Sequence, residues 1–390
     1  MRTAIINEWL ETYAGAELVI EQMLQVFAGA DMFALVDFLP KDQRAFLQGC
    51  KVHTSFIQHL PFARRNFRAY LPLMPLAVEQ YDLSNYELVI SSNHAVAKGV
   101  LTREDQLHVC YVHTPVRYAW DLYHSSLKAH GLALGPKSWA TRLILHYLRL
   151  WDHATAARVD AFAANSCYVA RRIWKTYRRR ATVIYPPVDV SRFEVQRRKD
   201  DCYVTVSRLV PYKRVDLIIE AFRRMPRKKL LVIGDGPERA ALERRAPPNV
   251  KLLGRQPAEA VTHHLQSARA FLFAADEDFG IAPVEAQACG TPVIAYGHGG
   301  ATETVRDGIT GVLFPQQSVE SIISAVETFE QREQTFDPSA IRNHAERFSP
   351  ERFRRRFARF VDHHHGRQRA ASQRRAPAKR KDRRQLSLRP

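Results

Sequence analysis

Two acidic side chains in the second half of the chain have the spacing needed to bind the hydroxyl groups of a sugar. Glu277 and Glu285 are eight residues apart in the segment AADEDFGIAPVEAQACGTPVIAYGHGGATETV (274–305). An apolar run ends just before Glu277, and Pro283 suits the first turn of a helix that would contain Glu285. Both carboxylates can therefore face one cleft, where they accept hydrogen bonds from the diols of a sugar and a ribose.

Two cations form a second candidate group. Arg208 and Lys213 are five residues apart in SRLVPYKRVDLIIEAF (207–222), between the end of an apolar run and the start of a helical pattern. A guanidinium and an ammonium at one strand–helix junction can clamp a diphosphate. If this pair is taken alone, two solvated surface charges are the alternative.

Two neighbouring patterns leave alternatives open. Gly234 and Gly236 follow an apolar run in VIGDGPE (232–238), without the third glycine of a dinucleotide-binding fingerprint. They predict either a close approach of the backbone to a nucleotide or a simple tight turn. The acidic run Asp276-Glu277-Asp278 is compatible with a metal site for a sugar diphosphate, and Glu285 with an acid that compensates a helix dipole. We favour sugar binding without a metal.

The elements that must position these residues follow an α/β rhythm. Each of several short apolar runs ends in a small or polar residue before a helical pattern begins. These runs lie at 3–9, 86–92, 107–113, 160–166 and 182–188, and again at 202–208 and 229–236. The rhythm is typical of parallel strands with crossover helices, whose functional residues lie at the carboxyl ends of the strands. We therefore expect an α/β fold.

A Pro-Pro pair divides this rhythm into two parts. Pro186 and Pro187 can continue neither a helix nor a central strand, so they mark a linker. We predict two Rossmann-like domains, residues 1–185 and 186–348, that face each other across a ligand cleft. A C-terminal amphipathic helix over 349–365 is predicted from four apolar residues at helical spacing. They are Phe353, Phe357, Phe360 and Val361.

Composition and charge narrow the class of protein. The 390 residues are 46% hydrophobic and 25% charged, the composition of an ordinary globular protein. Of the net charge of +18, ten Lys or Arg against one Asp place +9 in residues 366–390, which we predict to be a disordered basic tail. The five cysteines are scattered, no apolar run reaches about 18 residues, and the first residues do not form an apolar leader. These features predict a cytoplasmic protein.

The combination of motifs resembles the retaining family-four glycosyltransferases of GT-B architecture. The resemblance rests on E-x7-E followed by GTPVIAY-x-x-GG, on S-R-L-x-x-x-K-R and on V-I-G-D-G-P-E, and it runs from the first strand to about Val361. Gly15-Ala16-Glu17 is similar to the N-terminal Gly-Gly-Ala-Glu loop of that family, with Ala14 in place of the first glycine. The run HTPVRYAWD from His113 resembles the mannosyltransferases that build O-antigen and exopolysaccharide units.

The resemblance implies a role for each matching residue. Arg208 and Lys213 would neutralise the donor pyrophosphate, Glu285 would bind the ribose and Glu277 would hold the donor sugar. His113 would line the cleft near that sugar, and with Arg208, Lys213 and Glu277 it completes the expected catalytic group. The other expected donor-binding residues are Gly15, Ala16, Gly234, Gly236, Phe279, Gly280 and Ile281. The implied reaction moves a sugar, with mannose favoured, from a nucleotide sugar to a lipid-linked or polysaccharide-precursor acceptor, without a metal or another cofactor.

Basic residues interleaved with large apolar ones predict a surface of the protein that faces a membrane. The segment LPFARRNFRAYLPLMP (60–75) contains Arg64, Arg65 and Arg68, and RRIWKTYRRR (171–180) is a second such patch. Basic and aromatic residues together suit the surface of an anionic membrane, although an ordinary amphipathic helix packed on a sheet is the alternative. We place Arg117 and Tyr118 on the same acceptor side. The protein is thus predicted to be peripheral at the inner face of the plasma membrane.

Two other function classes are alternatives for this sequence. A nucleic-acid-binding protein is suggested by the pI of about 9.9, but the chain has no RNA-recognition aromatic motif, zinc finger or helix-turn-helix signal. We therefore expect no dedicated nucleic-acid partner. A nucleotide-sugar epimerase of the same fold is the other alternative. The sequence carries no signal for an oligomeric state.

Overall fold

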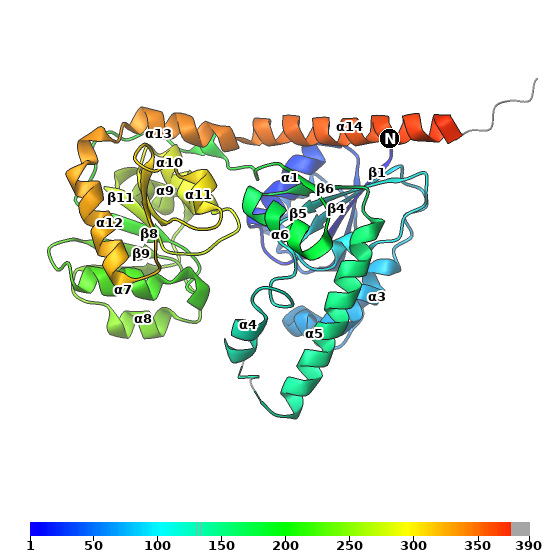
Figure 1. The fold of residues 1–390 in the computed structure, drawn as a ribbon, viewed down its shortest axis with the longest axis horizontal. Helices are drawn as coiled ribbons and strands as arrows, with labels where there is room; N and C mark the ends of the chain where they lie inside the picture. Colours follow the sequence, from blue (N-terminus) through cyan, green and yellow to red (C-terminus); the bar gives the residue numbers. More distant parts are fainter. Residues whose placement is uncertain (130, 133, 376–390) are drawn as a thin grey trace, which may run out of the picture.

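Two parallel sheets, each flanked by helices, make up the described part of the chain (Figure 1). The computed structural model describes residues 1–129, 131–132 and 134–375. The sheets confirm the expected α/β fold with two Rossmann-like domains. The chain crosses from the first sheet to the second between residues 184 and 202, and the expected boundary at 185/186 falls within that stretch.

The first domain contains a seven-stranded parallel sheet in the order β3-β2-β1-β4-β5-β6-β7. Every residue of the two central strands β4 and β5 is buried, because helices cover both faces of the sheet. The strands are β1 (Thr3–Leu10), β2 (Asp31–Asp37), β3 (Val52–Thr54), β4 (Leu88–Asn93), β5 (Leu107–Val112), β6 (Ala161–Ala164) and β7 (Ala181–Val183). The helices are α1 (Gly15–Val26), α2 (Ala63–Asn66), α3 (Met74–Glu79), α4 (Tyr123–Ala129), α5 (Pro136–Thr155) and α6 (Cys167–Tyr177).

The second domain contains a six-stranded parallel sheet in the order β10-β9-β8-β11-β12-β13. In both sheets the strand order reverses beside the first strand of the domain, and ligands of such folds bind at that point. The strands are β8 (Tyr203–Val206), β9 (Leu230–Ile233), β10 (Val250–Gly254), β11 (Ala270–Phe273), β12 (Val293–Tyr296) and β13 (Gly311–Phe314). The helices are α7 (Val215–Arg223), α8 (Arg239–Arg245), α9 (Ala258–Ser267), α10 (Ile281–Ala288), α11 (Ala301–Thr304), α12 (Val319–Gln331) and α13 (Pro338–Ala345).

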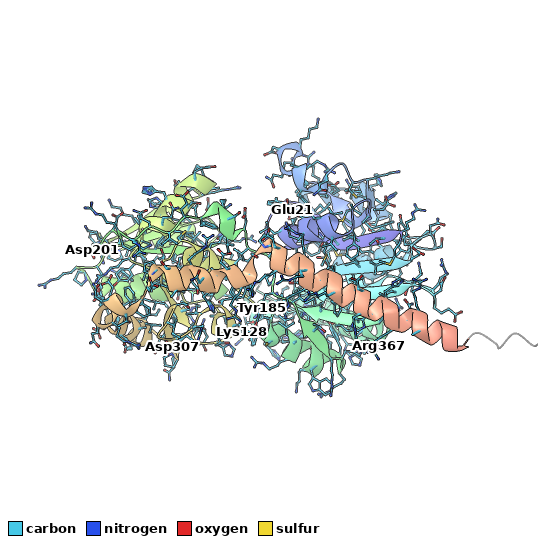
Figure 2. The ribbon with its side chains drawn as sticks, turned by 90° about the horizontal axis from the view of Figure 1, so that it is seen from above. Glu21, Lys128, Tyr185, Asp201, Asp307 and Arg367 are labelled. Atoms are coloured by element: carbon cyan, nitrogen blue, oxygen red, sulfur yellow. The ribbon has the colours of Figure 1, made fainter. Side chains whose placement is uncertain are left out.

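The last helix, α14 (Pro350–Arg375), begins at the second domain and packs on the first. Its predicted apolar residues, from Phe353 to Val361, are buried in one cluster with residues of β1, β5 and α1. Figure 2 shows α14 crossing above both domains, with Tyr185 labelled near the point where the chain passes between them. The helix therefore ties the end of the second domain to the first.

The predicted end of this helix at residue 365 is wrong. The helix continues to Arg375, so the first ten residues of the expected disordered tail are helical. Alanine, glutamine and arginine are good helix formers, and they extend a helix that packing has already nucleated. Residues 376–390 of the predicted tail lie outside the described part of the chain. No helix in the described part is both long and apolar enough to cross a membrane.

Candidate active site

A cleft of about 920 Å³ lies between the two domains. Its walls are the carboxyl ends of β1, β5 and β8 and the N-terminal ends of α1 and α10. Helix N-termini present free amide groups and a positive dipole end, so two of them beside one cleft favour an anionic ligand. The polar residues predicted from the two sequence motifs of the second domain meet here.

Lys213 and Glu277 form an ion pair in the cleft. The ammonium of Lys213 contacts Oε1 of Glu277, and the two side chains are 14% and 20% exposed. Lys213 ends a short 3₁₀ turn (Pro211–Lys213) that follows β8, while Glu277 follows β11. The topology places β8 and β11 side by side, which is why residues 64 positions apart in the sequence meet.

Arg208 lies in the same cleft but, unlike Lys213, does not pair with a carboxylate in the described part of the chain. Its side chain is exposed and lines the same cleft as Lys213. Within the described residues the guanidinium has no ion-pair or hydrogen-bond partner. An arginine that has no carboxylate partner presents all its donors to an incoming phosphate.

The loop before α10 forms part of the wall of the cleft. Phe279, Gly280 and Ile281 all line it, and Gly280 has a φ of 88°, a left-handed conformation that suits glycine. The loop rests on Gly300, whose amide donates to the carbonyl of Glu277 at 2.7 Å. A Cβ at Gly300 would lie 2.3 Å from Cα of Phe279, so the GG pair allows this close contact.

Glu285 lies one helical turn into α10 and lines the cleft. Its nearest partner is the exposed Arg192, whose Nη2 lies 3.4 Å from Oε1 of Glu285. Burial raises the pKa of the Glu285 carboxyl, and Arg192 opposes part of that rise. The ion pair with Arg192 engages only one oxygen of the carboxylate. The carboxylate can therefore still accept hydrogen bonds from a ligand in the cleft.

The N-terminus of α1 approaches that of α10 across the cleft. Gly15 and Ala16 line the cleft, and a Cβ at Gly15 would lie 2.8 Å from Cδ1 of Ile281. Ala14, at the N-cap, donates its amide to Oε2 of Glu17 at 3.0 Å. Ala14 therefore forms the helix start without a glycine at that position.

His113 lines the first-domain wall as predicted. Its Nε2 lies 2.9 Å from Oγ of Ser92, and the Asn165 side chain donates to its carbonyl at 2.8 Å. Burial lowers the pKa of His113 to about 4, and the neighbouring His94 contributes to the lowering. The ring is therefore neutral near pH 7, and it acts as a hydrogen-bonding group rather than as a charge.

Glu8 and His94 are functional candidates that the sequence analysis missed. Glu8 is completely buried, and its Oε1 accepts four amide hydrogens, from residues 94–97, at 2.8–3.0 Å. Its Oε2 lies 2.8 Å from Nδ1 of His94, which lines the cleft. These contacts lower the pKa of Glu8 to about 2 against the effect of burial, and Glu8 raises the pKa of His94 against its own burial. An acid inside the apolar run TAIINEWL was the signal that could have identified the pair.

A network of ion pairs joins the two domains beside the cleft. Asp278 of the second domain contacts Arg172 of α6, and Nη1 of Arg117 lies 3.8 Å from its Oδ1. Asp121 lies 3.1 Å from Arg172 and 3.5 Å from Arg117. Glu303 accepts the first two amides of α6 at 2.8 and 3.0 Å. Arg117 therefore lines the cleft as part of the contact between the domains.

The run Asp276-Glu277-Asp278 does not form a converging set of carboxylates. Asp276 pairs with His298 at 3.0 Å, Glu277 with Lys213 and Asp278 with Arg172. Each carboxylate thus has a different partner. Among the described residues no group of three or more His, Cys, Asp or Glu side chains is placed to hold a metal ion.

Five predicted site residues lie outside the lining of the cleft. Arg64 and Arg65 are exposed on α2. Within the segment 60–75, Phe62 has a left-handed φ of 57°, and Pro72 lies inside a 3₁₀ helix (Phe67–Leu73). Arg68, the third predicted arginine of this segment, does line the cleft, where it pairs with Glu11 at 2.5 Å. Tyr118 packs against a cluster that includes Leu145 and Leu148 of α5.

The remaining two, Gly234 and Gly236, position Arg208 from behind. A Cβ at Gly234 would lie 1.9 Å from the carbonyl oxygen of Ser207, and one at Gly236 would lie 2.3 Å from that of Leu209. The amides of Ser207 and Leu209 also donate to residues 233 and 235 at 3.0 and 2.9 Å. The two glycines therefore allow a close contact with the backbone on both sides of Arg208, and a nucleotide contact of VIGDGPE stays a prediction.

Replacing Gly234 with alanine is expected to lower the free energy of unfolding by about 2–3 kcal/mol, because the new methyl overlaps backbone that cannot move cheaply. Urea unfolding measures this effect, and calorimetry should show weaker nucleotide binding because Arg208 shifts. Gly366→Ala is the matched control, since no atom lies within 4 Å of a Cβ at that position. Equal unfolding midpoints for Gly234→Ala and the native chain would contradict the packing role.

Comparison with known proteins places this geometry in a family. Residues 13–192 match the family model described as Glycosyltransferase Family 4, and residues 189–349 match the model described as Glycosyl transferases group 1. Together the two models cover both domains and the cleft between them.

Curated relatives match over part of their length. A D-inositol 3-phosphate glycosyltransferase of Geodermatophilus obscurus is 29% identical over 309 residues, which are 70% of this chain and 65% of the relative. A GDP-mannose-dependent alpha-(1-6)-phosphatidylinositol monomannoside mannosyltransferase of Mycolicibacterium smegmatis is 35% identical over 170 residues, 36% of this chain and 44% of the relative. The chain thus matches less than two thirds of the length of either relative.

Solved structures share the fold over nearly the whole chain. Anabaena HepE, crystallised with UDP-glucose, has a TM-score of 0.67 at 17% identity, covering 93% of this chain and all of HepE. The lipopolysaccharide outer core galactosyltransferase WaaB has a TM-score of 0.63 at 18% identity, with coverages of 93% and 100%. At these identities the likeness shows the arrangement of two facing domains.

Proposed function

Because the chain belongs to the family-four glycosyltransferases of GT-B architecture, we propose that it transfers a sugar from a nucleotide donor with retention of the anomeric configuration. The observation that supports this most directly is one cleft containing Arg208, the Lys213–Glu277 pair, Glu285 and the N-terminus of α10. Cations, carboxylates and free amides together match a ligand that has both a diphosphate and hydroxyl groups.

Each group has a distinct task with the donor. Arg208 and Lys213 bind the diphosphate and stabilise the charge that grows on it as the sugar leaves. The amides of residues 279–281 donate hydrogen bonds to the sugar, and the carboxylate of Glu277 accepts hydrogen bonds from its hydroxyl groups. Glu285 binds the ribose hydroxyls. The leaving diphosphate oxygen takes the proton of the acceptor hydroxyl, which attacks from the face that the diphosphate leaves.

Neither carboxylate is proposed as a covalent nucleophile. Glu277 is engaged by Lys213, and Glu285 lies at the edge of the site beside Arg192. The two-carboxylate scheme of glycosidases therefore has no counterpart here. Retention follows from attack on the same face, in a site whose cations and helix dipoles stabilise the leaving group.

For the donor we propose GDP-mannose. Support comes from the run HTPVRYAWD and from the mannosyltransferase of Mycolicibacterium smegmatis, whose printed name specifies that donor. HepE, which was crystallised with UDP-glucose, makes a UDP sugar the competing donor. Thermal shift with GDP, UDP and ADP sugars distinguishes them, because at equal concentration the nucleotide that binds more tightly raises the melting temperature more.

The acceptor side of the cleft is assigned to the first domain. His94, held by Glu8, lines the cleft together with Arg68 and His113. We propose a lipid-linked or polysaccharide-precursor acceptor, whose hydroxyl would be received by these groups at the cytoplasmic surface of the membrane. Such a protein would be released from membranes by high salt, since each basic residue contributes only about 1 kcal/mol at an anionic surface.

The reaction itself tests the proposal. Proton NMR of the product formed with a candidate acceptor should show the same anomeric configuration as in the donor. Isomerisation or hydrolysis of the donor in the absence of any acceptor would instead indicate an epimerase-like activity. Retention on DNA that survives deletion of residues 376–390 would favour a nucleic-acid-binding protein.

Replacing Glu285 with glutamine is expected to raise the KM for the donor about tenfold, because a charged hydrogen-bond acceptor for the ribose is lost while its shape is kept. The turnover number should change much less, because the ribose is distant from the reacting bond. Steady-state kinetics measures both values. The matched control is Glu320→Gln, since Glu320 is an exposed acid of the same domain that pairs with Arg224. An unchanged KM in Glu285→Gln would contradict ribose binding.

A further inference from the structure

Helix α5 exposes an apolar face that no described part of the chain covers. Trp139, Leu143, Tyr147 and Leu150 are 77%, 70%, 46% and 60% exposed, and their spacing of three or four residues places them on one side of the helix. We call these four residues the α5 apolar face. Leu134, just before the helix, is 90% exposed. Single exposed apolar side chains are common, but a continuous stripe of this size marks an interaction surface.

The opposite side of α5 is well packed, so the helix has a defined orientation. Leu145 and Leu148 are buried in a cluster with Val116, Ala119 and Leu127. Asp152 is buried and contacts the ammonium of Lys98 and the hydroxyl of Tyr177. These contacts fix which face of α5 points outward. Figure 1 shows α4 and α5 extending together beyond the sheet of the first domain.

The charge of this helical pair favours an anionic partner. Residues 122–155 contain four Lys or Arg, and Asp152 is the single acid among them. Because Asp152 is buried against Lys98, it offers no negative charge to a partner. A second copy of the chain bound through this face would bring like charges together, whereas anionic lipid would complement them.

We propose that the α5 apolar face inserts into the surface of an anionic lipid bilayer and docks the first domain there. An aromatic and leucine stripe beside lysine and arginine suits the boundary between lipid headgroups and acyl chains. The segment that packs under α5 contains Arg117, which lines the cleft. Docking would therefore bring the acceptor side of the cleft to the membrane. The proposal extends the proposed lipid-linked acceptor but does not depend on the donor.

The experiment is co-sedimentation of the full chain with vesicles of phosphatidylcholine, with and without phosphatidylglycerol, in which no glycan acceptor is present. The native chain should pellet with the anionic vesicles, and its tryptophan emission should shift to shorter wavelength. The variant W139E/L143E should lower the partition coefficient at least about tenfold. Both substituted side chains point away from the core, so melting temperature and nucleotide binding should stay unchanged.

Trp174→Glu is the matched control. Trp174 is 49% exposed on α6, within the basic patch at 171–180, and is not part of the α5 apolar face. This variant should bind vesicles as the native chain does. The proposal is overturned if W139E/L143E binds as well as the native chain, if only Trp174→Glu loses binding, or if the native chain does not bind.

Sedimentation equilibrium without lipid tests whether a second copy of the chain, instead of lipid, covers the α5 apolar face. A native dimer that W139E/L143E converts to a monomer would show that a second copy covers the face and would overturn the proposal. Vesicle binding without any stabilisation by nucleotide sugars would leave docking intact while the proposed transfer failed, so the two failures are distinguishable.

Discussion

Alanine at Arg208 or Lys213 is expected to lower kcat/KM about 30- to 1000-fold, which corresponds to a loss of about 2–4 kcal/mol of transition-state stabilisation. Both cations line the cleft, and each would balance negative charge that develops on the leaving diphosphate. The effect should appear mainly in kcat, because the charge increases as the bond to the sugar breaks. Steady-state assays at saturating donor measure it.

The two variants should differ in a way that depends on Glu277. Lys213→Ala leaves the Glu277 carboxylate without its partner in the cleft, where it repels the diphosphate, whereas Arg208 has no carboxylate partner to release. The double variant K213A/E277Q should therefore lose less activity than the two single effects added together. Arg224→Ala is the control, because Arg224 is an exposed residue that pairs with Glu320. Turnover close to that of the native chain in either cation variant would refute the diphosphate clamp.

Glu8→Gln is expected to lower the free energy of unfolding by about 2–3 kcal/mol, because a buried charge-assisted network loses its charge. The amide of glutamine can still accept hydrogen bonds from residues 94–97 but cannot form the ion pair with His94. The same change should reduce transfer to the acceptor, since His94 lines the cleft. Urea unfolding and acceptor kinetics measure the two effects.

The pH dependence of the loss of stability in Glu8→Gln tests whether the Glu8–His94 ion pair causes it. The pKa of Glu8 falls from 4.5 to about 2 on folding, so its contribution is present above about pH 4.5 and disappears as the pH falls toward 2. The pKa of His94 rises on folding, so its contribution is present below its ordinary value of 6.5 and is lost as the pH rises through the raised value. The difference in stability between the native chain and Glu8→Gln should therefore be largest between about pH 4.5 and 6.5.

Glu11→Gln serves as the control for Glu8. Glu11 is 40% exposed and pairs with Arg68 on the surface of the cleft wall, so its replacement should cost less than about 1 kcal/mol. A stability difference for Glu8→Gln that is the same at pH 3, 5 and 8 would show that the charge of Glu8 does not stabilise the fold.

The contacts between the domains explain how one cleft can be assembled from two independent sheets. Asp278 and Glu303 of the second domain contact Arg172 and the N-terminus of α6 in the first. Helix α14 adds a second connection, because it leaves the second domain and packs on the first. The side chains proposed to bind the donor and those proposed to receive the acceptor are thus held in one cleft.

Local chemistry along the chain was enough to predict the α/β fold and four second-domain residues that line the cleft. Arg208, Lys213, Glu277 and Glu285 each lie within a few residues of a strand end or a helix start. The apolar runs and turn residues that create those positions are visible in the sequence, and parallel strands bring their carboxyl ends to one edge. The mannosyltransferase-like run HTPVRYAWD likewise predicted that His113 lines the cleft.

Contacts between distant segments were decided by the tertiary structure. Glu8 meets residues 94–97 across more than 80 positions, and Gly234 and Gly236 meet the backbone beside Arg208. The continuation of α14 to Arg375 and the outward face of α5 also depend on what packs against each helix. Periodicity shows that a helix has an apolar side. Whether another element covers that side or leaves it exposed depends on the packing of the whole chain.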